Sequence, residues 1–321
     1  MAKESNGNNR STNEQDHWIG FDLGGTKMLS VVFDSKFKPV GKCRKKTRGF
    51  EGMEAGLNRI NTIIKESIED ANISRKRIRA LGIGCPGPLD FKKGVIMEAP
   101  NLGWKDVPIK ESIEREFGFH AEIANDVDAG VFGEYSFGAG KGARCVFGIF
   151  PGTGIGGGCV YEGHLFRGSN TSCTEIGHIP VLPGGPQDGA GNPGSLESVA
   201  SRLSIASLAA QAAYRGAAPN LMKNAGTDIA SIRSGALSEA IRDGDKVVKD
   251  IVEDACYYLA MGVVTIVHLM APDIIVFGGG LVEAMPDFVL KKIEKTARPR
   301  ILASLRDDFK IVEAELGDDA T

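Results

Sequence analysis

The sequence has little excess charge, no closely spaced cysteine pair and no long apolar run. Its 38 Lys and Arg residues nearly balance its 41 Asp and Glu residues, so the net charge of −3 gives no reason to expect a nucleic-acid partner. The six cysteines contain no Cys-x-x-Cys pair, which favours reduced core thiols in a cytoplasmic protein. The most apolar segment, roughly 256–271, is too short and interrupted to span a membrane and is predicted to be a buried helix.

The chain is long enough for two domains of ordinary size, and its pattern repeats once. Residues 1–16 lack an apolar core and a cleavage pattern, so they are predicted to form a disordered polar tail rather than a signal peptide. A strand, a Gly-rich turn and a second strand follow, and the same plan restarts near residue 143. We therefore predict an α/β protein with two similar lobes, 17–124 and 125–321, and a cleft between them.

Secondary structure within the lobes follows from hydrophobic periodicity. Each lobe is expected to have three strands and then alternating helices and strands, and the segment HIPVL (178–182) is predicted as the third strand of the second lobe. Segment 86–104 is predicted as a loop, and 195–214 as one long helix. A long helix is also predicted at 245–271.

Three Gly-rich turns punctuate this plan, at 22–27 (DLGGTK), 152–158 (GTGIGGG) and 278–280 (GGG). Each could be an ordinary tight turn, but three such turns in a two-lobed α/β chain favour backbone sites for phosphate. The second turn matches Gly-x-Gly-x-x-Gly, yet a strand rather than a helix is predicted after it, which disfavours a dinucleotide fold. The first turn reads Gly-Thr-Lys and also precedes a strand, so it is not a P-loop.

Several carboxylates lie next to predicted strand ends. Asp22 closes the first strand and could orient magnesium, although an Asp that caps a turn is the simpler alternative. Asn125 and Asp126 lie where a strand gives way to a helix. Asp126 could be an N-cap, but in a cleft opposite phosphate-binding turns it would suit a general base that activates a hydroxyl for phosphoryl transfer.

Glu175 and His178 have a spacing that metal sites use, and Glu197 follows after a Gly/Pro-rich stretch. The three side chains could instead bind a hydroxyl-rich ligand, which needs several fixed donors and acceptors. A buried structural histidine and a carboxylate at a helix N-terminus are the simpler alternatives.

Eight ordered motifs give the chain a family resemblance. DLGGTK, CPGPLD, APNLGW, NDVDAGVFGE, GTGIGGG, EIGH, GSLESVAS and VFGGG occur in the order seen in sugar kinases of the ROK family, from about residue 18 onward. The chain looks most similar to the bacterial glucokinases of that family. The resemblance implies two actin-like (ribonuclease H-like) lobes, ATP and Mg²⁺ as cofactors, and transfer of phosphate to the 6-hydroxyl of a hexose, with glucose as the first expectation.

The resemblance also implies roles for residues of this sequence. Asp126 is the expected catalytic base. Hexose binding is expected from Asn125, Asp126, Glu175, His178 and Glu197, with Pro86 and Gly87 against the sugar. Nucleotide binding is expected from Asp22, Gly24, Gly25, Thr26 and Lys27, from Gly152, Thr153 and Gly154, and from Gly278 and Gly279.

Three features of the sequence depart from the family pattern. Many members bind zinc through a histidine at the position of His178 and through three cysteines. Here Asp188, Ala190 and Ser195 stand at the cysteine positions, so no structural zinc is expected. Asp128 replaces a usual Asn and is expected to alter the charge of the pocket. The chain stops at LGDDAT, where the family usually continues into a last helix, so a truncated end is one expectation.

Other functions stay open at this stage. Fructose, mannose or N-acetylmannosamine could be the acceptor, and polyphosphate could be the donor, because one hydroxyl changes binding by only a few kcal/mol, roughly 1–3 per lost partner. A sugar-responsive transcriptional regulator is less expected, because the 21 residues before Asp22 leave no room for a DNA-binding domain. A homodimer is the family-level expectation.

Overall fold

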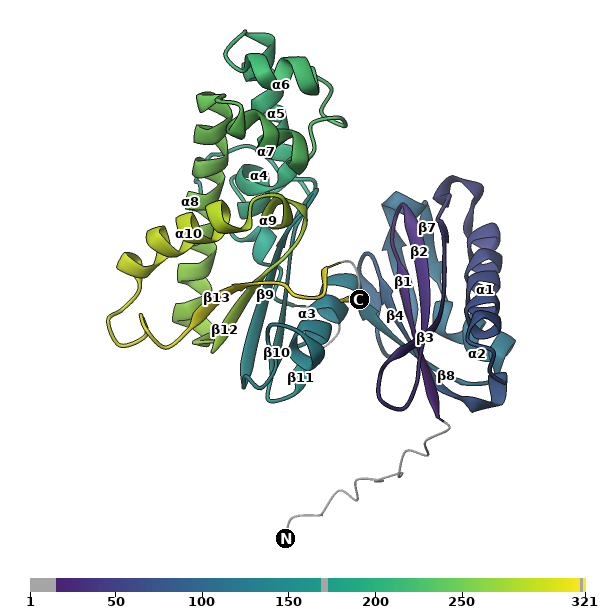
Figure 1. The fold of residues 1–321 in the computed structure, drawn as a ribbon. Helices are drawn as coiled ribbons and strands as arrows, with labels where there is room; N and C mark the ends of the chain where they lie inside the picture. The colour runs from purple at the N-terminus through teal and green to yellow at the C-terminus, as the bar shows by residue number, and fades with distance from the viewer. Residues whose placement is uncertain (1–15, 169–172, 318–319) are drawn as a thin grey trace. The chain divides into compact units, whose positions relative to one another are not determined.

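The computed structural model of the chain describes residues 16–168, 173–317 and 320–321 (Figure 1). Its contacts divide it into two compact units, one that ends at Asp126 and includes Thr321, and one that covers Val127–Ala320. The sequence predicts Asn125 and Asp126 in the second lobe. Their contacts group them with the first unit instead, because Asn125 ends a strand that pairs with Cys85 in the sheet of that unit.

The predicted tail lies outside the described residues, apart from its last residue, Asp16. That residue is buried rather than part of a solvated tail, and its carboxylate forms an ion pair with Arg79 Nε at 2.8 Å. Asp16 therefore belongs with the folded first unit, one residue before its predicted start.

The first unit contains a five-stranded sheet and a small antiparallel sheet among its described residues. Its strands are β1 (His17–Leu23), β2 (Lys27–Phe33), β3 (Pro39–Lys46), β4 (Ile78–Cys85), β5 (Leu89–Asp90), β6 (Val95–Ala99), β7 (Trp104–Val107) and β8 (His120–Asn125). Its helical segments are η1 (Gly49–Glu51), α1 (Met53–Asp70), η2 (Arg75–Arg77), η3 (Pro100–Leu102) and α2 (Ile109–Phe117). Both α-helices lie against the same side of the larger sheet (Figure 1).

The second unit also contains a five-stranded sheet within its described residues. Its strands are β9 (Cys145–Pro151), β10 (Ile155–Tyr161), β11 (His164–Leu165), β12 (Ile274–Phe277) and β13 (Lys310–Glu313). Its helical segments are α3 (Asp126–Phe137), whose first residue is grouped with the first unit, η4 (Ile176–His178), α4 (Leu196–Ala200), α5 (Arg202–Tyr214), α6 (Pro219–Asn224), α7 (Ser234–Arg242), α8 (Lys246–Met270), α9 (Gly280–Ala284), α10 (Pro286–Ala297) and η5 (Arg298–Arg300).

The two larger sheets have the same topology. Their strand orders are β3-β2-β1-β4-β8 and β11-β10-β9-β12-β13, so in each sheet an antiparallel hairpin and its third strand are extended by two parallel strands. The internal repeat predicted from the sequence is therefore present at the level of strand order. The parallel strands of each unit end at one edge of the sheet, and this edge carries the predicted site residues.

Alternating side chains of the second sheet pack on its two faces. Val146 of β9 and Val276 of β12 contact Val131 of α3 in one small cluster, whereas the neighbouring Phe147 and Ile275 belong to the main core on the other face. This is the period of two expected of strands that are covered on both sides. The sheet is thus packed between α3 and a helical layer that includes α8 (Figure 1).

Helix α8 would be long and apolar enough to cross a membrane by length and composition alone, and half of its most apolar 18-residue window is buried. Side chains along its length, from Val248 to Val267, belong to the main core of the second unit. A buried helix in the core of a globular unit meets the same criteria of length and composition. The sequence predicts such a buried helix for this segment.

Three local predictions were wrong. HIPVL is not a strand: Ile176–His178 forms η4 and Pro180 makes only an isolated bridge to Ser195, because a proline has no N–H to give to a ladder. The third strand of the second sheet is β11 instead. The segment 86–104 contains β5, β6 and the start of β7 rather than a loop.

The third wrong prediction is the single helix at 195–214, which is broken at Ser201. Ser201 is extended, and its hydroxyl accepts a hydrogen bond from Ser204 N as the cap of α5. The N–H of Arg202 donates to the carbonyl of Gly152 at 2.9 Å. The break therefore ties the start of α5 to the second Gly-rich turn.

Candidate functional site

The predicted residues of the first unit gather at the carboxyl edge of its larger sheet. Strands β1, β4 and β8 are parallel, with Asp22 beside Gly84 and Cys85 beside Asn125. Asp126 and the Pro86–Gly87 turn directly follow these strand ends. Burial raises the pKa of the Cys85 thiol, and the charges of Asp126 and then Asp22 raise it further, so both carboxylates act on the same buried group.

The first Gly-rich turn joins β1 to β2 at that edge. The backbone around Gly24 is tight, because a Cβ there would lie 2.7 Å from the carbonyl oxygen of Lys27. Thr47 holds the turn from the side: its hydroxyl donates to Gly24 O at 2.6 Å, and its N–H donates to Thr26 O at 2.9 Å. The turn exposes Gly25, Thr26 and Lys27, which leaves these groups accessible to a ligand.

Gly87 has a backbone that only glycine fits. Its φ is +83°, and a Cβ there would lie 1.9 Å from the carbonyl oxygen of Glu98 on β6. The close approach seats the Pro86–Gly87 turn on the small antiparallel sheet.

Gly87→Ala is therefore expected to destabilise the protein by more than about 3 kcal/mol, because left-handed strain of roughly 1–3 kcal/mol adds to a clash with rigid backbone. Gly103→Ala is the matched control, because Gly103 also has a positive φ of 66° but a methyl group there would meet nothing within 4 Å. Chemical denaturation of both variants tests this. Equal losses of unfolding free energy would show that the contact with Glu98 is unimportant.

The second and third Gly-rich turns gather in the same way at the carboxyl edge of the second sheet. β9 and β12 are parallel, with Ile149 beside Phe277. The turn 152–154 follows β9 and is closed by a hydrogen bond from Gly152 N to Gly154 O at 2.8 Å. Gly279, at φ +81°, approaches the carbonyl of Pro151 so closely that a Cβ would lie 3.0 Å from that oxygen.

Glu197 connects the second Gly-rich turn to the Gly/Pro-rich segment. It lies in the first turn of α4, and its Oε2 accepts a hydrogen bond from Ile155 N at 2.8 Å. A Cβ at Gly154 would lie 2.3 Å from the same oxygen. Arg202 adds a cation here, because its guanidinium donates to the Thr153 hydroxyl at 2.9 Å.

His178 lies beside Asp188 and Glu197, and one ligand-type atom of each residue lies within 4.8 Å of the others. His178 Nδ1 and Asp188 Oδ2 are 2.8 Å apart. Burial lowers the pKa of His178, but the hydrogen bond with Asp188 and the charge of Glu197 outweigh it, so the pKa lies above its ordinary value. Glu175 precedes η4 and is exposed, and its carbonyl accepts from His178 N at 3.1 Å.

This donor set does not fit a structural zinc. His178 Nδ1 and Asp188 Oδ2 are 2.8 Å apart, which is a direct hydrogen bond. Two ligands of one tetrahedral zinc, each at about 2.0–2.2 Å from the metal, stand roughly 3.3 Å apart or more. Glu197 Oε2 already accepts from Ile155 N, and Ala190 offers no side-chain ligand atom. The absence of structural zinc remains a prediction.

Sequence reasoning missed three residues of these sites. Thr47 is a buried residue next to a strand predicted at the surface. Asp188 was considered only because it stands where the family has a zinc-binding cysteine, not as a partner of His178. Arg202 lies inside a segment predicted as one helix. For Arg202 the available signal was Ser201, a typical N-cap residue within that segment.

Asp128 is buried on α3, and its Oδ1 lies 3.3 Å from a Cβ position at Gly158 on β10.

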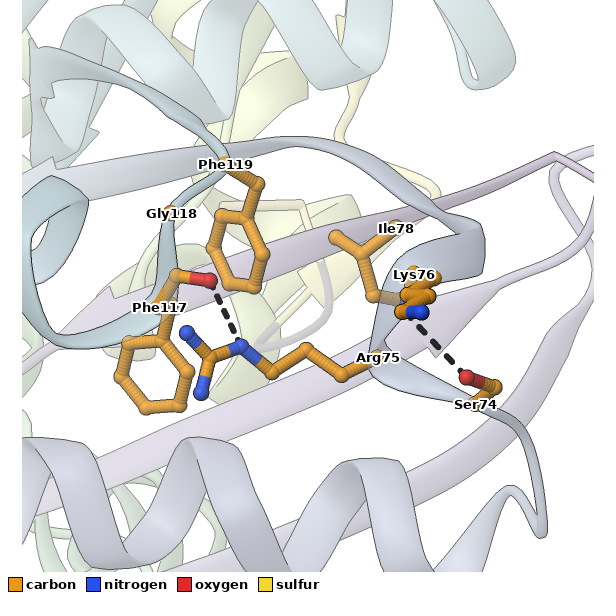
Figure 2. A pocket seen from close by; sticks show the side chains of 7 residues that line it. All are labelled: Ser74, Arg75, Lys76, Ile78, Phe117, Gly118 and Phe119. Carbon is orange, nitrogen blue, oxygen red and sulfur yellow. Dashed lines mark hydrogen bonds between the residues drawn. The ribbon is translucent and has the colours of Figure 1, made fainter.

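A pocket of about 580 Å³ in the first unit contains none of the predicted residues. It is lined by Ser74, Arg75, Lys76, Ile78, Phe117, Gly118 and Phe119. Figure 2 shows Arg75 beside Phe117, where its Nε donates to the carbonyl of Phe117 at 2.6 Å. The pocket lies where β4 and β8 begin, at the opposite edge from Asp22 and Asp126. Ligands of open α/β sheets bind at the carboxyl edge, so this pocket is not the candidate site.

Comparison with known proteins agrees with the topology. A glucokinase of Halalkalibacterium halodurans is 30% identical over 307 residues, which cover 95% of this chain and 92% of that protein. A putative xylose repressor of Caldicellulosiruptor is 27% identical over 94% of this chain but 75% of its own length. The crystal structure of a ROK family glucokinase from Streptomyces griseus with glucose and AMPPNP matches with a TM-score of 0.79 and 30% identity, over 95% of this chain and 96% of that one.

The predicted α/β class and the actin-like plan are confirmed by these structural matches. The ROK family profile matches residues 18–321, nearly the whole chain. The chain therefore belongs to the ROK family.

Proposed function

We propose that this protein transfers a phosphoryl group from ATP to the 6-hydroxyl of a hexose, and that the hexose is glucose. The observation that carries the proposal is the position of Asp126, directly after β8 at the edge that also holds Asp22 and the first Gly-rich turn. Similarity to glucokinases supports ATP as the phosphoryl donor and glucose as the acceptor. Use of ATP also supports a cytoplasmic protein.

Asp126 accepts the proton of the attacking hydroxyl in this proposal. The hydroxyl oxygen forms a bond to the γ-phosphorus, the bond from that phosphorus to the leaving ADP oxygen breaks, and the proton moves to the Asp126 carboxylate. Phosphoryl transfer needs little covalent help from the protein, so placement and charge neutralisation supply most of the rate. Asn125, Glu175, His178 and Glu197 bind and orient the hexose hydroxyls.

The Gly-rich turns fit a nucleotide. Gly24, Gly154 and Gly279 are positions where a Cβ would meet a neighbour at 3.0 Å or less, so a larger residue would require that neighbour to move. In this proposal the backbone amides of these turns bind the phosphates. Asp22 would orient Mg²⁺, which neutralises phosphate charge when bound. Arg202, beside Thr153, adds a positive charge to the second turn.

A panel of hexoses crossed with ATP and polyphosphate tests the proposal. We expect ATP and glucose to give glucose 6-phosphate with the highest kcat/KM, and fructose, mannose and N-acetylmannosamine to react more slowly. Substrates that differ in one hydroxyl should differ by about 5- to 150-fold, the effect of roughly 1–3 kcal/mol in the pocket. Preference for another sugar or for polyphosphate would correct the substrate, and no turnover with any pair would overturn the kinase proposal.

The xylose-repressor relative favours one second candidate, a sugar-responsive regulator. A regulator would bind a sugar without turning it over. Calorimetry on the same panel separates the candidates, because the kinase proposal expects both binding and product, whereas the regulator expects binding alone.

A further inference from the structure

We propose that the carboxylate of Asp188 positions His178 for the hexose and fixes its tautomer, in place of a metal ion. This inference rests on the proposed function, because it concerns the histidine expected to bind the sugar. Asp188 is a positioning residue here: it acts through His178 and is not proposed to touch the substrate.

The first step concerns the burial of Asp188. Its loop is Gly/Pro-rich and mostly exposed, yet the side chain of Asp188 is fully buried. Its Oδ1 accepts hydrogen bonds from the backbone N–H groups of Ala190 and Asn192, both at 2.9 Å. A buried carboxylate is costly unless it is well paired, so this loop is built around the charge.

The second step concerns what the other oxygen joins. Asp188 Oδ2 accepts from Ser195 Oγ at 2.7 Å and from His178 Nδ1 at 2.8 Å. Ser195 caps α4, since its hydroxyl also accepts from Ser198 N. One carboxylate thus ties η4, which carries His178, to the start of α4, which carries Glu197. Burial alone raises the pKa of Asp188, but these hydrogen bonds more than compensate and hold the pKa well below its ordinary range.

The third step is the proton on the ring. An ionised carboxylate can only accept hydrogen bonds, so His178 Nδ1 must carry a hydrogen. In the neutral ring, Nε2 then has a lone pair and presents an acceptor to the ligand. Asp188 therefore decides which kind of hydrogen bond His178 offers to a sugar hydroxyl.

The substitution Asp188→Asn gives a sharp expectation. An amide must direct its NH₂ group either toward the two backbone N–H groups, which can only donate, or toward His178 and Ser195. The second orientation keeps both 2.9 Å backbone hydrogen bonds and gives up only the longer one, 3.4 Å, from Asn192 Nδ2 to the other oxygen. It requires Nδ1 of His178 to accept. The neutral ring then moves its proton to Nε2, so the variant reverses the hydrogen bond that His178 offers.

Asp228→Asn is a matched control. Asp228 lies in a loop of the same unit, its Oδ1 accepts from Ala230 N at 3.1 Å, and its Oδ2 accepts from Ser231 Oγ at 2.7 Å. Like Asp188, it accepts one hydrogen bond from the backbone N–H two residues later in the chain and another from a serine hydroxyl. It has no histidine among these partners, so it controls for the loss of a loop carboxylate.

The experiment records long-range ¹H–¹⁵N spectra of the full chain, purified without added metal, at a pH well above the raised pKa of His178. His178→Gln identifies the His178 signal. We expect the Nδ1–H tautomer in the wild type and in Asp228→Asn, and the Nε2–H tautomer in Asp188→Asn. A wild-type ring with its proton on Nε2 would overturn the proposal without any variant, and so would an unchanged tautomer in folded Asp188→Asn.

Kinetics supply a second measurement. Asp188→Asn should raise KM for the best hexose at least about tenfold, because a misdirected hydrogen bond to a charged or polar group is worth roughly one order of magnitude. The kcat and the KM for ATP should stay within about twofold, since the substitution leaves Asp126 and the Gly-rich turns in place. A parallel loss in kcat and in both KM values would point to general damage and count against the proposal.

Metal analysis completes the test. One zinc per chain, with a His178 signal that changes on chelation, would show that a metal rather than Asp188 holds the ring. If the wild type phosphorylates no hexose, the proposed function fails, whereas the tautomer spectra still decide whether Asp188 positions His178.

Discussion

Replacing Asp126 by asparagine is expected to lower kcat for hexose phosphorylation by about 10²–10⁴-fold, the usual contribution of a positioned general base. The amide keeps the size and the place of the side chain at the start of α3 but cannot take a proton. Hexose affinity should therefore change little. Steady-state assays of product together with calorimetric titration of glucose measure the two quantities separately.

Asp287→Asn is the control for the simpler role of Asp126. Asp287 also lies in the first turn of a 12-residue helix, α10, and its side chain is 87% exposed. A carboxylate at such a position stabilises a helix by about 0.5–2 kcal/mol through capping or the helix dipole. If Asp126 only stabilises α3, both variants should lose a little thermal stability and keep kcat, and that outcome would remove Asp126 from the mechanism.

The sequence predicted Asp126 at the end of a strand, because strand ends are a local signal, but it did not predict that Asp126 belongs to the first unit. A buried apolar run, HAEIAN, stops where DVDAG begins, and a parallel neighbour ends in the same way at CPG. Parallel strands end at one edge of their sheet, so Asp22, Asn125 and Asp126 are brought together by topology alone. The repeated strand order made the same argument hold for the turns at 152–154 and 278–279.

The surroundings of His178 could not be predicted in this way. HIPVL has the apolar alternation of a strand, but its proline cannot complete a ladder, and tertiary contacts decide the result. The hydrogen bond of Asp188 to His178 spans a loop that has no periodicity from which to predict it. The cysteines missing from this loop predict only that it binds no structural zinc, whereas the burial of Asp188 became visible only in the folded chain.

The contact between Gly154 and Glu197 is another pairing without a sequence signal, and it gives the second large expected effect. Gly154→Ala should lower kcat/KM for the hexose by about 10- to 100-fold, because a hydrogen bond to a charged group is worth roughly 1.5–3 kcal/mol. The new methyl group would lie 2.3 Å from Glu197 Oε2, so the carboxylate must leave Ile155 N and its place beside His178. Product assays over a range of glucose concentrations give this ratio.

Gly152→Ala separates this effect from ordinary loss of a glycine in the same turn. A Cβ at Gly152 would meet nothing closer than Gly154 O at 3.9 Å, and neither glycine has a positive φ. Both variants should melt within a few degrees of the wild type, since Glu197 Oε2 is the movable end of a side chain and alanine restricts the unfolded chain slightly more than glycine. Equal losses of kcat/KM in the two variants would show that the turn, rather than Glu197, is responsible.

A double-mutant cycle then decides whether Gly154 acts through Glu197. Glu197→Gln removes the charge but keeps the size of the side chain. If alanine at 154 acts by displacing that carboxylate, the double variant should be hardly worse than the poorer single variant, because the same interaction cannot be lost twice. Additive losses would mean that Gly154 and Glu197 contribute independently, one to the nucleotide and the other to the hexose. Strong non-additivity would instead identify this contact as the physical link between the second Gly-rich turn and the hexose-binding residues of the second unit.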